Sequence, residues 1–164
     1  MKTFIGTKII KALPMTRLEY NDYRGWELPE EEQGLEYEAG MLVEYNDSDH
    51  QNHLDHEGYI SWSPMPVFEA AYRETEGLSF GLAIDAMKKG FRVARSGWNG
   101  KNMFLFLVPG SKFKVNRPPL LGIYQEGTEI NYCPHIDMRT ADGKVVPWLA
   151  SQTDMLADDW SIVE

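Results

Sequence analysis

The stretch LSFGLAIDAMKKGFRVARSGWNG, residues 78–100, contains a complete helix signal followed by a strand and a turn. Ser79 is placed to cap the helix and Gly90 to end it. Apolar side chains recur between them at helical spacing, namely Phe80, Ala83, Ile84 and Met87. This pattern predicts a helix over 80–89 whose apolar face packs on a sheet.

Strand signals and one more helix signal follow in the same half of the chain. The Asn99-Gly100 pair favours a tight turn, which puts Trp98 near the tip of a loop between two strands. The segment 109–130 is punctuated by Gly and Pro and predicts a long loop. Ser151 is placed to cap a last short helix. Strands are predicted at 91–94, 103–108, 136–138, 145–148 and 160–163, the last as an edge strand.

The N-terminal half has its own set of strand and helix signals. We predict a strand at 5–10, a helix at 16–24, a hairpin of 41–45 and 59–62 with a polar insertion at 46–58, and a helix capped by Ser63 with Pro64 in its first turn. The whole chain is therefore predicted to be α+β, with two small modules, each a short antiparallel sheet packed with one or two helices.

Charge divides the chain at the same place as the structural signals. Residues 1–77 carry 6 basic and 16 acidic side chains, whereas residues 78–164 carry 10 basic and 9 acidic ones. A short charged stretch ending in Gly77 separates the halves. We therefore predict two domains, an acidic accessory module at 1–77 and a second module at 78–164, each small enough to gain stability from association.

Composition excludes several classes of function. The net charge of −9 argues against binding a nucleic-acid polymer, which needs a basic surface. The single cysteine, Cys133, has no partner for an internal disulfide, and the first residues lack the apolar core of a signal peptide. No apolar run reaches the roughly 18 residues of a membrane span. We expect a reduced, cytoplasmic protein that does not bind membranes.

The polar insertion at 46–58 raises one metal hypothesis. His50, His53, Asp55 and His56 have spacings at which imidazoles could converge on zinc or nickel. The insertion has no cysteine and no second cluster, however, so a solvated loop is the favoured interpretation and no metal is predicted.

Three motifs in the second module resemble a known family. They are GWNGK at 97–101, PHIDM at 134–138 and VPWLASQTDMLA at 146–157. With the stretch at 78–100, they make residues 78–164 resemble the phage family called Thoeris anti-defence protein two. TKIIKALPMT at 7–16 and GYISWSPMPVFEAAYR at 58–73 make residues 1–77 resemble another small phage domain with no established activity.

The resemblance implies a function without catalysis. Members of that family bind and sequester cyclic ADP-ribose isomers, the signals of TIR-domain enzymes in bacterial Thoeris defence, without degrading them. Some members also hold cyclic oligonucleotides in separate pockets. The resemblance further implies a homo-oligomer, commonly a tetramer with pockets between subunits, acting without a cofactor in the cytoplasm of an infected bacterium.

A ligand of this kind needs an aromatic plate, hydrogen-bonding groups and donors for its pyrophosphate. Trp98 and Trp148 are the candidates to stack on the base, with a buried core role as the alternative for each. The free backbone amides at the start of the last predicted helix could bind phosphate, and the Asp154 carboxylate there could accept hydrogen bonds from ribose hydroxyls. A role as N-cap alone is the alternative for Ser151. This helix start comprises Ser151, Gln152, Thr153 and Asp154.

Further candidates flank the turn and lie on one strand. Arg95, Asn99 and Lys101 flank Trp98 and could meet the pyrophosphate or the base edge, with solvated charge as the alternative for the two cations. His135 and Asp137 share one side of a strand and either line the pocket or form a hydrogen-bonded core.

Two other functions remain open from the sequence. The first is an adaptor that binds proteins through the acidic module. The second is a hydrolase of the cyclic nucleotide, with acid and base groups supplied by His135, Asp137 and Asp154. A Cys133–His135 nucleophile pair is disfavoured, because side chains two apart on a strand are not aimed at each other and no oxyanion motif accompanies them.

Overall fold

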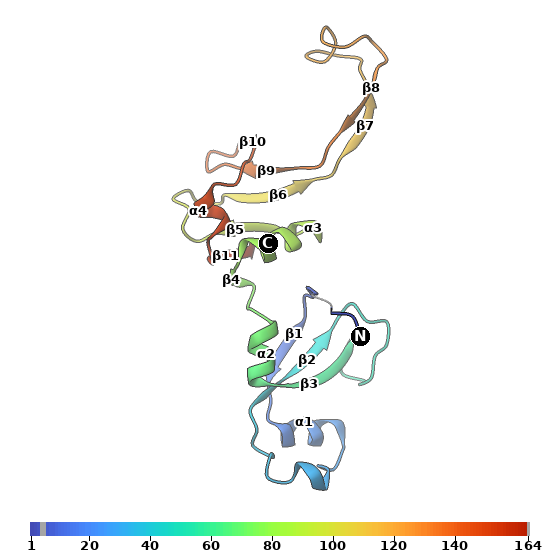
Figure 1. The fold of residues 1–164 in the computed structure, drawn as a ribbon, viewed down its shortest axis with the longest axis vertical. Helices are drawn as coiled ribbons and strands as arrows, with labels where there is room; N and C mark the ends of the chain where they lie inside the picture. The colour runs from blue at the N-terminus through green and yellow to red at the C-terminus, as the bar shows by residue number, and fades with distance from the viewer. Residues whose placement is uncertain (4–5, 164) are drawn as a thin grey trace. The chain divides into compact units, whose positions relative to one another are not determined.

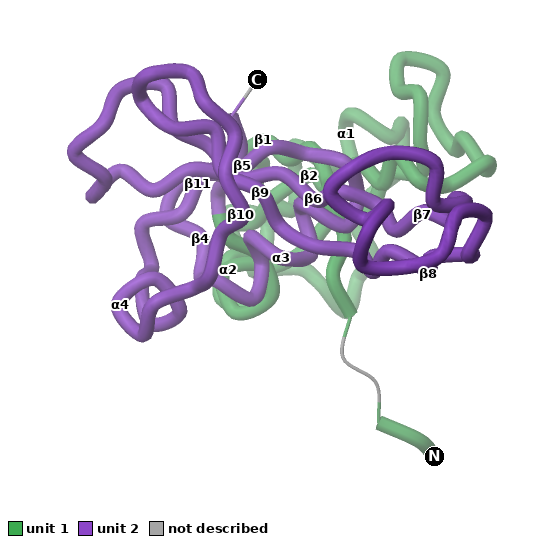
Figure 2. Tube along the Cα trace, turned by 90° about the horizontal axis from the view of Figure 1, so that it is seen from above, with its two compact units in different colours: residues 1–73 green, residues 74–164 purple. Residues whose placement is uncertain are grey.

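The computed structural model of the 164-residue chain describes residues 1–3 and 6–163. The chain divides into two compact units, unit 1 at residues 1–73 and unit 2 at residues 74–164 (Figure 2). The predicted domain boundary after Gly77 lies four residues further along. The two differ because residues 76–78 form a strand of the sheet of unit 2.

Unit 1 is a three-stranded antiparallel sheet with two α-helices and a short 3-10 turn (Figure 1). Its elements are β1 (Lys11–Pro14), α1 (Arg17–Arg24), η1 (Glu30–Glu32), β2 (Gly40–Tyr45), β3 (Tyr59–Pro64) and α2 (Met65–Ala71). The strands follow one another in the order β1-β2-β3.

A capping box sets the start of α1, and the pairing of β3 with β2 sets the start of α2 at Met65. The Thr16 side chain accepts from the Glu19 amide, and the Glu19 carboxylate accepts from the Thr16 amide, which is a capping box at the start of α1. The prediction that Ser63 caps α2 is wrong, because β3 stays paired with β2 as far as Pro64, which stands at the N-cap.

The first strand also differs from its prediction. Residues 6–10 form no strand, and Ile5 lies outside the described residues. β1 begins at Lys11 and includes Pro14, which sits at the end of an edge strand, where a missing amide costs least.

Unit 2 is a six-stranded antiparallel sheet with α3 packed against it. Its elements are β4 (Glu76–Leu78), α3 (Phe80–Lys88), β5 (Arg92–Arg95), β6 (Phe104–Val108), β7 (Ser111–Lys114), β8 (Glu129–Tyr132), β9 (His135–Arg139), β10 (Val145–Pro147), α4 (Gln152–Met155) and β11 (Trp160–Val163). The strand order is β10-β9-β6-β5-β11-β4. The predicted α+β class with short antiparallel sheets is confirmed.

Two predictions for unit 2 need correction. β11 is an interior strand, because it pairs with β5 on one side and with β4 on the other. The segment predicted as a long loop contains β7 and β8, which pair with each other and project beyond the sheet as an arm (Figure 1). The sequence predicted a loop here because Gly and Pro lie close to the ends of both strands.

The core of unit 2 lies between α3 and one face of the sheet. Trp160 is fully buried there, together with Val93 and Leu105 from the central strands and Ala83 and Met87 from α3. Burying these side chains stabilises the fold by about 1.5–3 kcal/mol for each large one. Within residues 1–3 and 6–163, no helix has the length and apolar character needed to cross a bilayer.

Candidate functional site

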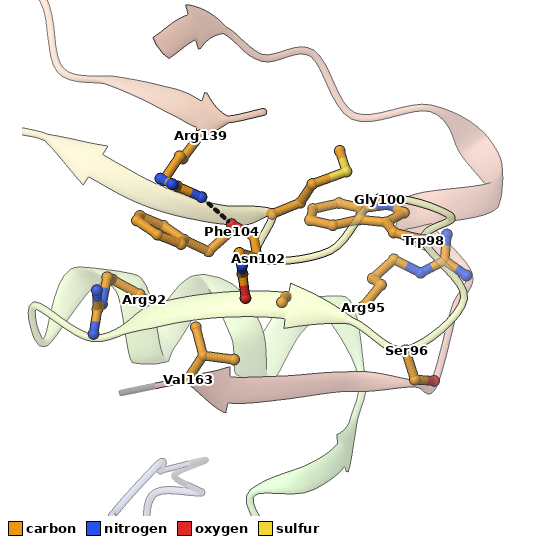
Figure 3. A pocket seen from close by; sticks show the side chains of 11 residues that line it. Arg92, Arg95, Ser96, Trp98, Gly100, Asn102, Phe104, Arg139 and Val163 are labelled. Atoms are coloured by element: carbon orange, nitrogen blue, oxygen red, sulfur yellow. Dashed lines mark hydrogen bonds between the residues drawn. The ribbon is translucent and has the colours of Figure 1, made fainter. Parts of the chain in front are cut away.

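A cleft of about 660 Å³ opens in unit 2 at the loop between β5 and β6 (Figure 3). It is lined by residues of the strands β5, β6, β9 and β11 and of the loop at 96–103. Its lining includes Arg92, Arg95, Trp98, Asn102, Phe104 and Arg139. Sites for small molecules have volumes of roughly 300–1,000 Å³, so the cleft is of suitable size.

Trp98 forms one wall of the cleft and is half-buried. Its ring meets Trp160 edge-on with centroids 5.4 Å apart, and its Nε1 donates to Asp154 Oδ1 at 3.3 Å. Trp98 lies in the loop between β5 and β6 as predicted, but its ring is turned back onto the buried Trp160, which gives the indole an apolar surface to cover. One indole is thus shared between the core and the cleft.

Arg95 holds this wall in position through two carboxylates. Its Nε donates to Asp159 Oδ1 at 2.7 Å, and one terminal nitrogen donates to Asp154 Oδ1 at 2.8 Å. The same Asp159 accepts the Gly97 amide at 2.8 Å, which fixes the residue before Trp98. The hydrogen bond from Arg95 holds the pKa of Asp159 below its ordinary value, and both carboxylates raise the pKa of Arg95.

The start of α4 is closed by its own side chains. Ser151 Oγ accepts the Asp154 amide at 3.1 Å, and Asp154 Oδ2 accepts the Ser151 amide at 3.2 Å, so the capping box is complete. Burial alone would raise the pKa of Asp154, but hydrogen bonds from Ser151, Arg95 and Trp98 lower it overall. Thr153 joins this network, because its carbonyl oxygen accepts from Arg95 and its hydroxyl lies 2.8 Å from Ser151 Oγ.

Trp148 packs on the same core and also contacts the buried indole of Trp160. Its ring centroid lies 6.1 Å from that of Trp160 and 6.1 Å from that of Phe80. The two predicted stacking residues, Trp98 and Trp148, thus both contact the same buried tryptophan.

The structure does not bring all predicted site residues together. Those in one network are Arg95, Trp98, Ser151, Thr153 and Asp154, with Trp148 joined through Trp160. Asn99, Lys101 and Gln152 are exposed. His135 and Asp137 alternate with Ile136 and Met138, which pack against the core, so they lie on the face of the sheet away from the core, which Phe104 and Arg139 of the cleft lining share, although neither lines the cleft itself.

On that second face, His135 and Asp137 lie near each other. His135 Nε2 is 3.7 Å from Asp137 Oδ1, an atom that is buried without a hydrogen bond in the described part of the chain. His135 Nδ1 donates to the carbonyl oxygen of Cys133 at 3.1 Å, so the ring is turned to the backbone and not to the thiol.

Of the residues that line the cleft, sequence reasoning found Arg95 and Trp98 and missed the others, among them Arg92, Asn102, Phe104 and Arg139. The alternation of side chains along a strand could have indicated two of them, since Arg92 and Phe104 precede the core residues Val93 and Leu105 and therefore lie on the other face of the sheet. Only the register, which sets Phe104 opposite Arg139, shows that these residues meet.

Two histidines, His53 and His56, connect the insertion at 46–58 to Tyr23 of α1 and Glu44 of β2, and these four residues are called the clasp below. His56 Nδ1 lies 3.2 Å from Glu44 Oε2 and its Nε2 lies 3.0 Å from the Tyr23 hydroxyl. His53 stacks on the Tyr23 ring with centroids 4.4 Å apart. Among the residues that the structure describes, no three His, Cys, Asp or Glu side chains are arranged to hold a metal.

Comparison with known proteins concerns unit 2. Residues 78–163 match the model of the Thoeris anti-defense 2-like domain. A curated relative, Thoeris anti-defense 2 of Bacillus phage SP01, is 45% identical over 86 residues, which cover 52% of this chain and 94% of the relative. The matched segment contains every residue that lines the cleft.

Proposed function

The chain belongs to the Thoeris anti-defense 2-like family, and from this premise we propose that unit 2 binds and sequesters a cyclic ADP-ribose-type signalling nucleotide without cleaving it. Membership supports a role in phage anti-defence. The action would take place in the cytoplasm of the infected bacterium, where such a signal is made, and it requires no cofactor.

The observation that carries the proposal is the composition of the cleft. A cyclic ADP-ribose isomer has an adenine ring, two riboses and a dianionic pyrophosphate. The cleft combines an indole, Trp98, with the guanidinium groups of Arg92, Arg95 and Arg139. Stacking of a base on an aromatic side chain contributes about 1–3 kcal/mol, and guanidinium groups pair with phosphate through two parallel hydrogen bonds.

Sequestration at nanomolar concentrations needs a binding free energy of about −12 kcal/mol, which contacts in an open cleft do not supply alone. We therefore propose a homo-oligomer, with a tetramer favoured, in which a neighbouring subunit encloses the ligand. The arm supports this, because Tyr132 on its two-stranded ribbon and Ile123 in the loop that joins the two strands are exposed, and such a ribbon is marginally stable on its own. Cyclic oligonucleotides remain a second proposed ligand class.

The hydrolase alternative is disfavoured by the arrangement of its three candidate groups. Asp154 is engaged by Ser151, Arg95 and Trp98, next to the core around Trp160, whereas His135 and Asp137 lie on the face of the sheet away from that core. General acid and base groups must reach the same bond, and these do not converge.

The proposal is tested by capture and release. The pure full-length protein is incubated with the product of a TIR-domain enzyme, freed of unbound ligand, denatured by heat, and the supernatant is analysed by mass spectrometry. Intact signal in stoichiometric amount supports sequestration. A product of different mass would indicate catalysis, and an empty supernatant would favour the protein-binding adaptor.

A substitution of the cleft wall adds a residue-level test. Trp98→Ala should weaken capture at least tenfold, since it removes the stacking surface. Trp98→Phe keeps an aromatic ring against Trp160 and a smaller stacking surface, so it should retain more capture than Trp98→Ala. Trp26→Ala, which changes an exposed indole of unit 1, is the matched control and should leave capture unchanged. Equal capture by the wild type and both Trp98 variants would refute the stacking role.

A further inference from the structure

We infer that Arg92 and Arg139, held against the ring of Phe104, form a phosphate-binding subsite that takes the diphosphate of a nucleotide, and this inference rests on the proposed function for the identity of that nucleotide. The subsite lies at the end of the cleft away from Trp98 (Figure 3).

Strand register brings the three side chains together. Phe104 on β6 lies directly opposite Arg139 on β9. The neighbouring pair Val93 and Leu105 has its side chains in the core, so Arg92 and Phe104, one position before each, share the second face of the sheet. The residues that the figure shows as neighbours are thus fixed by backbone hydrogen bonds.

Phe104 holds both guanidinium groups. The Arg92 Cζ atom lies 5.0 Å from the ring centroid and the Arg139 Cζ atom lies 5.9 Å from it. Arg139 is held further by a 2.7 Å hydrogen bond to the Asn102 carbonyl oxygen. A guanidinium already positioned on a ring loses less side-chain entropy when it binds an anion.

Within residues 1–3 and 6–163, no carboxylate forms an ion pair with either of these two arginines. The cleft lining likewise contains no carboxylate among the described residues. Arg95, at the other end, is paired with Asp154 and Asp159. Two of the three guanidinium groups therefore remain available to an anionic ligand, in a chain whose net charge is −9.

The chemistry of the ligand follows from this pattern. Two adjacent guanidinium groups that have no carboxylate partner suit a dianion whose charged oxygens lie on neighbouring phosphorus atoms, such as a diphosphate. The indole at the other end suits a base attached to that group. The subsite should therefore bind inorganic pyrophosphate by itself and should contribute nothing to the binding of adenosine.

The test is calorimetric titration of the full-length protein with inorganic pyrophosphate, ADP-ribose and adenosine. Arg92→Gln combined with Arg139→Gln should weaken pyrophosphate and ADP-ribose binding at least tenfold and leave adenosine binding unchanged. Arg117→Gln, which removes the same charge from the exposed arm, is the matched control and should change each affinity less than twofold. Arg92→Lys combined with Arg139→Lys keeps the charge without the planar guanidinium group and should give intermediate affinity.

The possible results separate this inference from the proposed function. Pyrophosphate binding that the double Gln variant abolishes, in a protein that does not retain the TIR product, would sustain the subsite and sink the sequestration. Unchanged retention of the TIR product by the folded double variant would overturn the subsite and sustain the sequestration. Absence of pyrophosphate binding by the wild type would also overturn the subsite.

Discussion

Arg95 Nε and Asp159 Oδ1 lie 2.7 Å apart although 64 positions separate the two residues in the chain. The pair joins the end of β5 to the turn before β11. Because Asp159 also accepts the amide of Gly97, the ion pair orders the loop that presents Trp98 to the cleft. The position of a predicted ligand-binding side chain thus depends on a contact outside its own loop.

Asp159→Asn should lower the free energy of unfolding by about 1–3 kcal/mol, because it removes one of the two carboxylates that pair with a half-buried guanidinium. The measurement is denaturant unfolding followed by tryptophan fluorescence. Asp158→Asn changes an exposed neighbour and should stay within about 0.5 kcal/mol of the wild type. If the two variants have equal stability, the ion pair does not stabilise the loop.

Stability should fall on acidification. The hydrogen bond from Arg95 lowers the pKa of Asp159 in the folded chain, so the stabilisation is complete above the unfolded value near 4 and is lost as pH falls through the folded pKa. Denaturant midpoints measured from pH 7 to pH 3 should decline mainly below about pH 4. Asp159→Asn should decline less steeply over that interval, and a parallel decline would contradict this assignment.

The clasp of unit 1 gives a separate prediction. Glu44 is buried, and its Oε1 accepts the amides of Glu57 and Gly58 at 2.9 and 3.1 Å. Glu44→Gln places an amide group among donors and should lower the free energy of unfolding by about 1–3 kcal/mol.

Hydrogen exchange of residues 46–58 is the local measurement for that clasp, and Glu44→Gln should speed it. Glu57→Gln, whose side chain is exposed, is the control and should leave the exchange rates as they are. Equal rates in all three proteins would mean that the carboxylate does not hold the insertion.

Two Gly→Ala substitutions should have opposite effects. A Cβ at Gly40 would lie 2.6 Å from the Ser63 carbonyl oxygen and would overlap the Trp62 ring, so Gly40→Ala should destabilise unit 1. At Gly81 the nearest atom would be 3.8 Å away in helix α3, so Gly81→Ala should stabilise the chain by about 0.5–1 kcal/mol. Thermal unfolding decides both, and a gain in stability at Gly40 would show that the close approach to β3 is absent.

Local signals predicted the local elements well. Ser79 does cap α3, whose predicted end at 89 lies one residue beyond the observed one, and Ser151 does cap α4. These elements were predictable because a capping hydroxyl and helical spacing act within one or two turns. The strand pairing of 111–114 with 129–132 was not, because it depends on residues that are distant in the chain.

The site shows the same division. Residue types alone pointed to Trp98, Arg95 and Asp154, which the fold joins, but also to His135 and Asp137, which it turns to the other face of the sheet. The amino-acid sequence by itself determined the helices, the α+β class and the family of residues 78–163, because these follow from short-range patterns and matched motifs. Only the tertiary structure decided that Arg92 and Arg139 share the ring of Phe104 and that Arg95 is neutralised, because the register between strands and the pairing of distant charges are properties of the folded chain.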